Sequence, residues 1–457
     1  MHGVLLGIIS ILRKKAFVSS WRDWLCKGSN AEMFCIRRLN RRDFSKSIRK
    51  NSLSLITGMI VLVLCIAAST FLAASRRGSL GPRTNAATEA GTLNRPFVPK
   101  IYPLKGYVID GEFRTHLHQQ CINSSTGSGI AFPAIAKHAI RLKTLMIDDR
   151  SPNRTLANSE TLQFFDTVQN CLLDDREYKK WGFSLPLLFE TPHGACFRTR
   201  ARNDKPTALD DRIGGMTHVD AILAALAEAD VPLSTPIYPS SGKELTLLDV
   251  LEDSLKRVTR DRQQEREIEW TVVACTRYLQ SQPRWLGAHG DPVELDDLAR
   301  LLVEMDPMAS ACLGTHRLYA MANLFARNSA EPGYLRDGTC EAVSNQLAEV
   351  VRRLEAHQLE DGSWNEAWFS AANPLENKDK PRSTTELEDK LRVTGHMLEW
   401  MTMVPPKSRT SPQCMRKAVV WLESMFRLQG ELCFDKHLLP STHAVRALCL
   451  LSEKETP

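Results

Sequence analysis

A histidine recurs in a similar helical context along this chain, and this recurrence constrains the fold more than any other feature. The segments KHAIRLKTL, at residues 137–145, and THAVRALCL, at residues 442–450, are close copies of one another. Three more histidines stand in comparable surroundings, so that the set is His138, His218, His316, His396 and His443. Such recurrence predicts a repeat architecture, in which each unit is a helical hairpin that stacks on its neighbours to bury its apolar face.

The charge of the chain is unevenly distributed. The 457 residues have a formal net charge of +6, but residues 1–50 hold 12 Lys and Arg against 3 Asp and Glu. This segment therefore carries +9, which leaves −3 for the remaining residues. Because nucleic-acid binding requires basic residues clustered on the folded part, the distribution argues against a nucleic-acid partner.

An uncharged, apolar run predicts a membrane anchor. Residues 51–75 contain no charged side chain, which matches the roughly 20 residues that a helix needs to cross a bilayer. We therefore predict a single transmembrane helix at residues 51–75, preceded by a basic cytoplasmic tail at residues 1–50. Lys and Arg are more numerous before this run than after it, which predicts a cytoplasmic N-terminus and an extracytoplasmic C-terminal domain. The membrane is thus one expected partner.

An export signal is the alternative to a retained anchor. Residues 40–46 (NRRDFSK) resemble the twin-arginine signal, and small residues near the end of the apolar run would suit a signal peptidase. Such a signal usually lies nearer the start of a chain, so a retained anchor is favoured. Residues 76–105 are rich in Gly, Pro, Ser and Thr and are expected to form a flexible linker. The folded domain is then expected at residues 106–457.

Nine cysteines lie beyond the apolar run, an odd number without any C-x-x-C pair. No zinc ribbon or redox pair is therefore indicated. Disulfides would suit an extracytoplasmic domain, but the spacing does not assign a pairing. Cys275, Cys312 and Cys449 stand in apolar stretches interpreted as helical, where a free cysteine behaves as a small apolar residue.

Two kinds of helix alternate through the domain. One kind is amphipathic, as at residues 341–358, where apolar residues recur at helical spacing. The other kind is apolar on most faces and begins near the histidines and near Trp270. An amphipathic helix faces a core on one side, whereas a helix that is apolar nearly all round is buried. About six helices of each kind predict an all-α domain, an (α/α)6-like toroid with an inner ring inside an outer ring.

A turn motif adds a family resemblance. The segment QLEDGSW contains Q-x-x-D-G-x-W, with Gln358, Asp361, Gly362 and Trp364 at its defining positions. It resembles the turn motif of the terpenoid cyclase and protein prenyltransferase superfamily, whose members are α/α toroids. There the Gln ends an outer helix, Asp-Gly forms the turn and the Trp packs onto the ring. Residues 280–285 and 429–434 are weaker copies. The resemblance implies a fold and not a reaction.

The catalytic motifs of that superfamily are not found. Triterpene cyclases carry D-x-D-D, and the nearest string, ELDD at residues 294–297, is typical of an acidic first helical turn. No Asp, Cys and His set matches the zinc site of the prenyltransferases. Nor is there a G-x-S-x-G, H-E-x-x-H, Walker or Rossmann motif.

The candidate ligand-binding residues are the five histidines together with Glu399, one helical turn after His396. If each histidine begins an inner helix, the imidazoles converge on the mouth of a central cavity, where the positive helix end keeps them neutral. Neutral imidazole binds metal or accepts a proton. The alternative is that each ring bonds a loop carbonyl and joins one repeat to the next. This structural role is favoured, since a motif repeated around a ring is what it predicts. Contact with a substrate comes second, and a divalent metal is the least favoured.

Two classes of function remain open. The first is a ligand-binding or scaffolding domain at the cell envelope, with a small-molecule or envelope partner. The alternative is an enzyme acting on a carbohydrate or isoprenoid-like substrate in the toroid cavity, where Glu366 and Asp361 near Trp364 and Trp368 would suit a sugar. The cavity lining distinguishes them. Aromatic walls favour a lipid, carboxylates with raised pKa values favour hydrolysis or elimination, and a plugged ring leaves only the scaffold.

Overall fold

The structure is a computed structural model that describes residues 91–127, 132–146, 159–181, 183, 185–199, 218–258, 268–287, 289–305, 312–369 and 386–453. The chain divides into two compact units, Met1–Arg83 and Thr84–Pro457, and the described residues all belong to the second. The expected cytoplasmic tail and transmembrane helix lie outside the described residues. Among the helices that are described, none has the length and apolar character needed to cross a bilayer.

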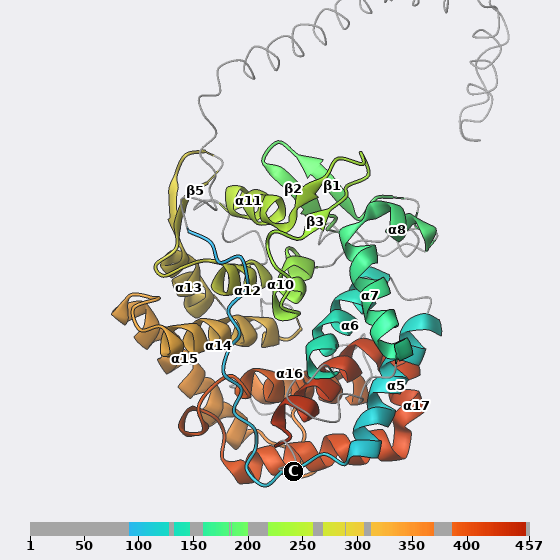
Figure 1. Ribbon diagram of the computed structural model, residues 1–457. Coiled ribbons are helices and arrows are strands. Elements are labelled where there is room, and N and C mark those ends of the chain that lie inside the picture. Colours follow the sequence, from blue (N-terminus) through green and yellow to red (C-terminus); the bar gives the residue numbers. More distant parts are fainter. Residues whose placement is uncertain are drawn as a thin grey trace, which may run out of the picture. The chain divides into compact units, whose positions relative to one another are not determined.

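The second unit is predominantly helical, which confirms the predicted all-α class (Figure 1). Its α-helices are α5 (Gly111–Gly127), α6 (Phe132–Met146), α7 (Ser159–Leu173), α8 (Asp175–Lys180), α10 (Ala221–Glu228), α11 (Leu247–Arg257), α12 (Glu269–Tyr278), α13 (Leu295–Glu304), α14 (Thr315–Ala330), α15 (Asp337–Ala356), α16 (Glu386–Met401) and α17 (Pro412–Leu451). Two short 3-10 helices are η2 (Glu366–Phe369) and η3 (Pro406–Ser408).

Three antiparallel hairpins connect helices in the described part of the chain. They pair β1 (Leu188–Thr191) with β2 (Gly194–Phe197), β3 (Pro236–Ile237) with β4 (Leu245–Thr246), and β5 (Arg284–Leu286) with β6 (Pro292–Glu294). The sequence did not predict them, because strands of two to four residues are too short to show an alternating pattern. Each remains a two-stranded ribbon and does not alter the helical class.

Six helices contact one another in a closed series. α6 packs against α10, and α10, α12, α14, α16 and α17 follow in order, after which α17 packs against α6 again. Every residue of α10 and of α12 is buried. A helix without an exposed face is stable only when other elements surround it, so these helices form the interior of the domain.

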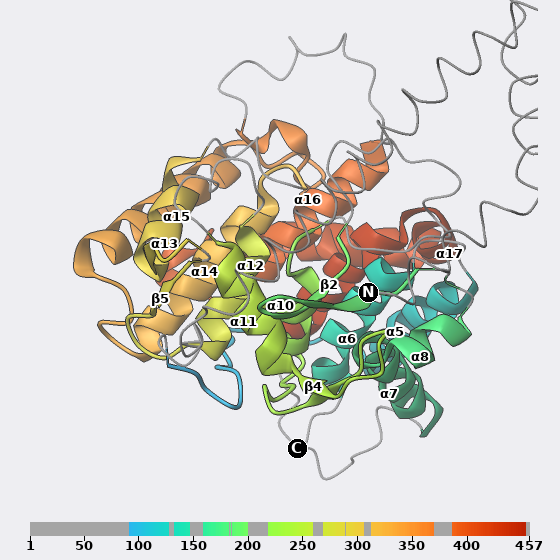
Figure 2. The ribbon, with the colours of Figure 1, turned by 90° about the horizontal axis from the view of Figure 1, so that it is seen from above.

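Amphipathic helices cover this interior. α7 packs on α6, α11 on α10, α13 on α12 and α14, and α15 on α14, with α7 and α15 at opposite margins of the fold (Figure 2). α15 buries Val343, Leu347, Val350 and Leu354, which lie three or four positions apart. This stripe is the pattern from which an outer helix was predicted, and it faces inward as expected.

α17 supplies both an outer and an inner segment. Its backbone leaves helical angles at Gln429 and at His437, and Pro440 follows the second bend. Proline has no N–H and its ring clashes with the carbonyl four residues earlier, which favours a bend there. The part before Gln429 alternates buried and exposed residues, as an amphipathic outer helix does. The part after the second bend contains His443 and is buried.

Residues 91–105, expected as the end of a flexible linker, lie across the ends of several interior helices (Figure 1). Five backbone hydrogen bonds of 2.7–2.8 Å hold them: Leu93 N–H to Tyr278 O, Phe97 N–H to Arg277 O, Tyr102 N–H to Thr402 O, Leu104 N–H to Leu451 O, and Leu233 N–H to Asn94 O. Carbonyls at the C-terminal end of a helix lack partners within the helix. The segment therefore caps α12, α16 and α17, whose C-terminal ends lie on one side.

The Q-x-x-D-G-x-W motif forms the turn after α15 and clamps it to α17. The Gln358 amide donates to the carbonyls of Gly362 and Cys414, both at 2.8 Å. Gly362 has φ +94°, and a Cβ there would lie 2.5 Å from the carbonyl oxygen of Lys417. Only glycine adopts this conformation readily and permits this approach.

The remaining motif residues are also structural. Asp361 Oδ1 accepts the backbone N–H of Ser363 at 2.9 Å, and the Trp364 indole donates to the Leu354 carbonyl at 2.8 Å. Both Trp364 and Trp368 are fully buried. Their faces are therefore covered by protein, and the sugar site expected beside them is not supported.

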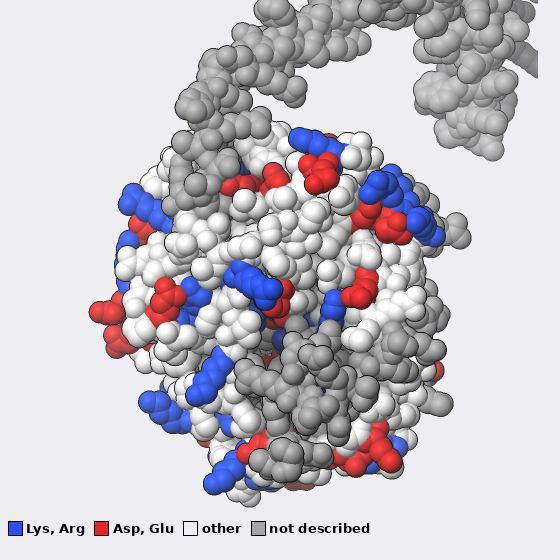
Figure 3. All heavy atoms as spheres, viewed as in Figure 1, with Lys and Arg blue, Asp and Glu red and all other residues white. Residues whose placement is uncertain are grey.

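Charged side chains of both signs are interspersed on the face drawn in Figure 3. The described part of that face therefore carries no broad basic patch of the kind that nucleic-acid binding requires.

Candidate functional site

The five histidines converge on one cavity of about 260 Å³. Ten of its fourteen lining residues are charged or are histidines: Lys137, His138, His218, His316, Glu388, Arg392, His396, Lys436, His437 and His443. The other four are Cys312, Leu438, Leu439 and Pro440. Among the lining residues that the structure describes there is no Phe, Trp or Tyr, and most of them carry an ionisable side chain.

The histidines reach the cavity in different ways. His316 is the second residue of α14 and His218 precedes α10, but His138, His396 and His443 lie within α6, α16 and α17. The expectation that each begins an inner helix was therefore wrong for three of the five. A residue within a helix faces the cavity through the 3.6-residue period, not through its distance from the helix end.

Two overlapping groups of potential metal ligands share His316. The ligand atoms of His218, Cys312 and His316 lie within 4.8 Å of one another, as do those of His316, His396 and His443. Both groups are close enough to contact a single ion after small side-chain movements. The spacing of the rings decides between them.

Two pairs of imidazoles, which share His316, have the spacing of ligands on one ion. The ring centroids of His218 and His316 are 4.7 Å apart, and those of His316 and His396 are 5.2 Å apart. Two imidazoles on one tetrahedral Zn²⁺, with Zn–N bonds of about 2.0–2.1 Å, would have centroids about 5 Å apart. His443, by contrast, is stacked on His396 at 3.6 Å and lies 6.4 Å from His316. His443 therefore packs behind the ligand group.

Cys312 adds a sulfur ligand from a strained turn. Cys312, Leu313 and Gly314, just before α14, have φ of 50°, 59° and 83°. Non-glycine residues rarely adopt positive φ, and such strain is concentrated at functional sites. The interpretation of Cys312 as part of an apolar helix was wrong, because the turn before α14 depends on tertiary contacts. The only signal in the sequence was Cys312 four residues before His316.

The surroundings of Cys312 favour its thiolate. Burial alone would raise the pKa of the Cys312 thiol, but His316 and hydrogen bonding to His218, His316 and His396 hold that pKa well below its usual range. The thiolate is the form that binds metal. Cys312, His218 and His316 therefore form one candidate ligand group, with His396 beside it.

Three of the histidines have a lowered pKa, which favours the neutral ring, but the cause differs from the predicted one. Burial lowers the pKa of His138, His396 and His443, and the cations Lys137 and Arg141 lower the pKa of His138 and His443 further. Burial, not a helix dipole, therefore sets the protonation state. Neutral imidazole is the metal-binding form.

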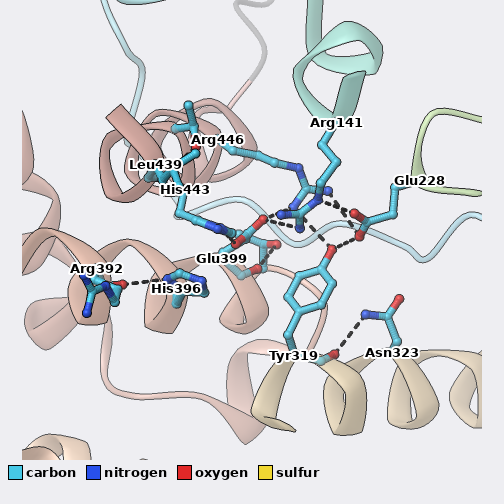
Figure 4. Close-up of polar contacts among 12 residues, drawn as sticks. Arg141, Glu228, Tyr319, Asn323, Arg392, His396, Glu399, Leu439, His443 and Arg446 are labelled. Carbon is cyan, nitrogen blue, oxygen red and sulfur yellow. Dashed lines mark hydrogen bonds and ion pairs between the residues drawn. The ribbon is translucent and has the colours of Figure 1, made fainter. Parts of the chain in front are cut away.

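Hydrogen bonds orient two of the rings (Figure 4). His396 Nδ1 lies 2.7 Å from the carbonyl oxygen of Arg392, so Nδ1 donates and Nε2 carries the lone pair. His443 Nδ1 lies 2.7 Å from Glu399 Oε2. Metal-binding histidines are typically oriented by such bonds to a carbonyl or carboxylate.

Glu399 belongs to a buried ion network and not to the ligand group. Arg141 donates to Glu399 at 2.6 Å and also contacts Glu228, and Arg446 donates to Glu399 as well (Figure 4). Burial alone would raise the pKa values of both carboxyls, but Arg141 and Arg446 hold them below their usual range. The network joins α6, α10, α16 and α17 and fixes His443 behind His396.

Comparison with protein-family models, with curated proteins and with solved structures found no significant match to this chain. The resemblance to the terpenoid cyclase superfamily therefore depends on the turn motif and the helical pattern.

None of the nine described cysteines is part of a disulfide, so no pairing of them is observed.

Gly395 permits the close approach of α16 and α17 beside the cluster. A Cβ at Gly395 would lie 2.7 Å from the backbone nitrogen of Ala444, next to His443. We expect Gly395→Ala to push the helices apart and to lower the free energy of unfolding by about 1–3 kcal/mol in urea denaturation. Gly338→Ala in α15, whose Cβ would meet nothing within 4 Å, is the control and should be neutral or stabilising. Equal stability of the two variants would contradict the contact.

Proposed function

We propose that the cavity binds one divalent transition-metal ion, most suitably Zn²⁺, through Cys312, His218 and His316. The observation that carries the proposal is the arrangement of two imidazoles at ligand spacing beside one low-pKa thiol. Thiolate and imidazole together suit Zn²⁺ better than Mg²⁺ or Ca²⁺, which prefer oxygen ligands. The metal, the least favoured interpretation from sequence, thus becomes the preferred one.

We propose further that the site is catalytic. A structural zinc site is closed by four ligands, whereas a catalytic site keeps a position open for water or substrate. The ligand group here adjoins a cavity of about 260 Å³, which accommodates water and a small molecule. Zinc lowers the pKa of bound water to about 7, so hydrolysis is the reaction class that the site suits.

The alternative substrates receive less support. An isoprenoid chain requires apolar or aromatic walls, and this lining is dominated by histidine and charged side chains. A carbohydrate site beside Trp364 and Trp368 conflicts with the burial of both rings. If the chain binds the ion but no small ligand can reach it, the domain is a scaffold that catalyses no reaction.

For the architecture we propose the (α/α)6-like toroid. The closed series of contacts from α6 back to α17 supports an inner ring, and the amphipathic helices outside it support an outer ring. Anchoring at residues 51–75 and an extracytoplasmic domain remain proposals drawn from the sequence, as does export through a twin-arginine signal. A relation to the terpenoid cyclases is supported by the Gln358–Trp364 turn alone.

We expect the purified full-length chain to contain about one equivalent of zinc in elemental analysis. His316→Ala and Cys312→Ala should each weaken zinc affinity by about 100-fold in chelator competition, because three protein ligands share a binding free energy of about 10–16 kcal/mol. His116→Ala removes an exposed imidazole of α5 and should leave affinity unchanged.

Two results would overturn the metal site. One is a wild-type chain that neither contains zinc nor binds it tightly. The other is unchanged zinc affinity in both the His316→Ala and the Cys312→Ala variants. Loss of affinity in His116→Ala as well would point to a general loss of folding, which circular dichroism of the same samples would show.

A further inference from the structure

His396 lines the cavity beside the proposed metal site but is not one of its three ligands. Of the two groups of potential ligand atoms, it belongs only to the one that contains neither Cys312 nor His218. That group shares His316 with the metal site, and the ring centroids of His316 and His396 are 5.2 Å apart. The His396 ring therefore lies next to the position that the three ligands define for an ion.

Two contacts fix the orientation of the His396 ring (Figure 4). Its Nδ1 lies 2.7 Å from the carbonyl oxygen of Arg392, one turn earlier in α16. The ring is also stacked on that of His443, with centroids 3.6 Å apart, and His443 is itself held by Glu399 at 2.7 Å. The ring has little freedom to rotate, so the position of its Nε2 atom is set before any ligand binds.

The Nε2 atom of His396 is buried and has no hydrogen-bond partner among the residues that the structure describes. The residue as a whole is 3% exposed. Because Nδ1 donates to a carbonyl, Nε2 carries the lone pair and requires a donor. The Cys312 thiol is a donor only while it is protonated, and as a metal-bound thiolate it only accepts. Buried polar atoms in proteins nearly always have a partner, so this acceptor indicates a ligand with a hydrogen to donate.

A water molecule on the ion would lie within reach of this Nε2 atom. Three protein ligands leave one position of a tetrahedral zinc ion for water, and that oxygen lies about 3.3 Å from each ligand nitrogen. A hydrogen bond spans about a further 2.8 Å, so an acceptor up to about 6 Å from a ligand nitrogen can be reached. The ligand atoms of His316 and His396 lie within 4.8 Å of one another, which satisfies this limit.

We infer that His396 accepts a hydrogen bond at Nε2 from the water that completes the coordination of the metal ion, and so positions that water. The inference rests on the proposed metal site and adds a residue that contacts its reactive oxygen. One O–H of the water is fixed on His396, and its oxygen is fixed on the ion. The oxygen is therefore presented to the cavity in one orientation, which is what attack on a bound substrate requires.

Azide binding to the cobalt-loaded, full-length chain tests the inference, with ligand exchange followed by visible absorption. Azide displaces the water but has no hydrogen to donate, so it cannot satisfy His396 in place of water. We expect azide to bind about 5-fold more tightly to His396→Phe than to the wild type, because the variant no longer stabilises the water. His116→Phe, which replaces an exposed imidazole of α5, should bind azide as the wild type does.

The direction of this change distinguishes the role of His396 from a structural one. Phenylalanine keeps a ring that can stack on His443 but has no Nε2 atom. A variant that only loosened the site would bind azide more weakly, not more tightly. Azide affinity in His396→Phe that is equal to or lower than that of the wild type would therefore overturn the inference. If this variant does not fold, His396→Leu is judged by the same criterion.

Cobalt affinity of the same samples, measured by chelator competition, separates the inference from the metal site. We expect His396→Phe to bind cobalt as the wild type does. A loss of about 100-fold, as for His316→Ala, would make His396 a ligand, which overturns the inference and leaves the metal site standing. A cobalt-loaded wild type whose spectrum azide does not change would do the same, because no position would be open to water. A wild type that binds no cobalt would overturn the metal site as well.

Discussion

Glu228→Gln is expected to lower the free energy of unfolding by about 3–5 kcal/mol. The Glu228 carboxylate is 1% exposed and contacts Arg141, Arg277 at 3.5 Å and Arg446 at 3.8 Å, and it accepts the hydroxyl of Tyr319. Glutamine keeps the shape of the side chain but removes its charge. Arg141 and Arg446 then still pair with Glu399, but Arg277 loses the negative charge that it faces. A buried charge without compensation destabilises the folded state.

Guanidinium chloride denaturation, monitored by circular dichroism, measures this change. Glu177→Gln is the matched control, since Glu177 forms an exposed pair with Lys180 at 2.6 Å. An exposed ion pair contributes about 0–1 kcal/mol, so this control should remain near the wild type. A Glu228→Gln variant as stable as the control would show that the network does not depend on its charge.

Acid is expected to destabilise the metal-free chain strongly between pH 6.5 and 5.5. Burial lowers the pKa of His118 to about 3 and holds the pKa values of His138 and His443 well below 6.5. The unfolded chain takes up protons on these histidines near pH 6.5, whereas the folded chain does not. Stability is therefore full above pH 6.5 and is lost as the pH falls. Each histidine contributes up to about 1.4 kcal/mol per pH unit, so three contribute about 4 kcal/mol.

Urea denaturation in the presence of a chelator, at half-unit steps from pH 7 to pH 5.5, measures this slope. His118→Gln should reduce the slope by up to about 1.4 kcal/mol per pH unit, because it removes one buried titrating group. His116→Gln, two residues earlier in α5 and exposed, should leave the slope unchanged. A free energy of unfolding that is constant over this range would contradict neutral, buried histidines.

Much of the fold was accessible from periodicity. The apolar spacing of Val343, Leu347, Val350 and Leu354 predicts an inward-facing stripe, and those four residues are buried in α15. The apolar segment after Trp270 predicts a buried helix, and α12 is buried throughout. Both patterns depend only on local helical geometry, which the order of residues specifies directly.

The site was predictable in part. The recurring histidines identified the residues that meet in the cavity, although three of them lie within helices and not at helix ends. Cys312 was not identified as a candidate ligand. Its position depends on three consecutive residues with positive φ, an arrangement that has no local pattern in the sequence.

The sequence by itself determined the helical class, the alternation of buried and amphipathic helices, the turn at Gly362 and the histidines that share a cavity. These features follow from side-chain periodicity and from the conformational preferences of single residues, which act over a few positions of the chain. Tertiary structure alone decided which imidazoles have ligand spacing, that Cys312 joins them, and that Arg141, Glu228 and Glu399 form one network. Those relations depend on distances between helices that are far apart in sequence, and such distances are set by packing over the whole domain.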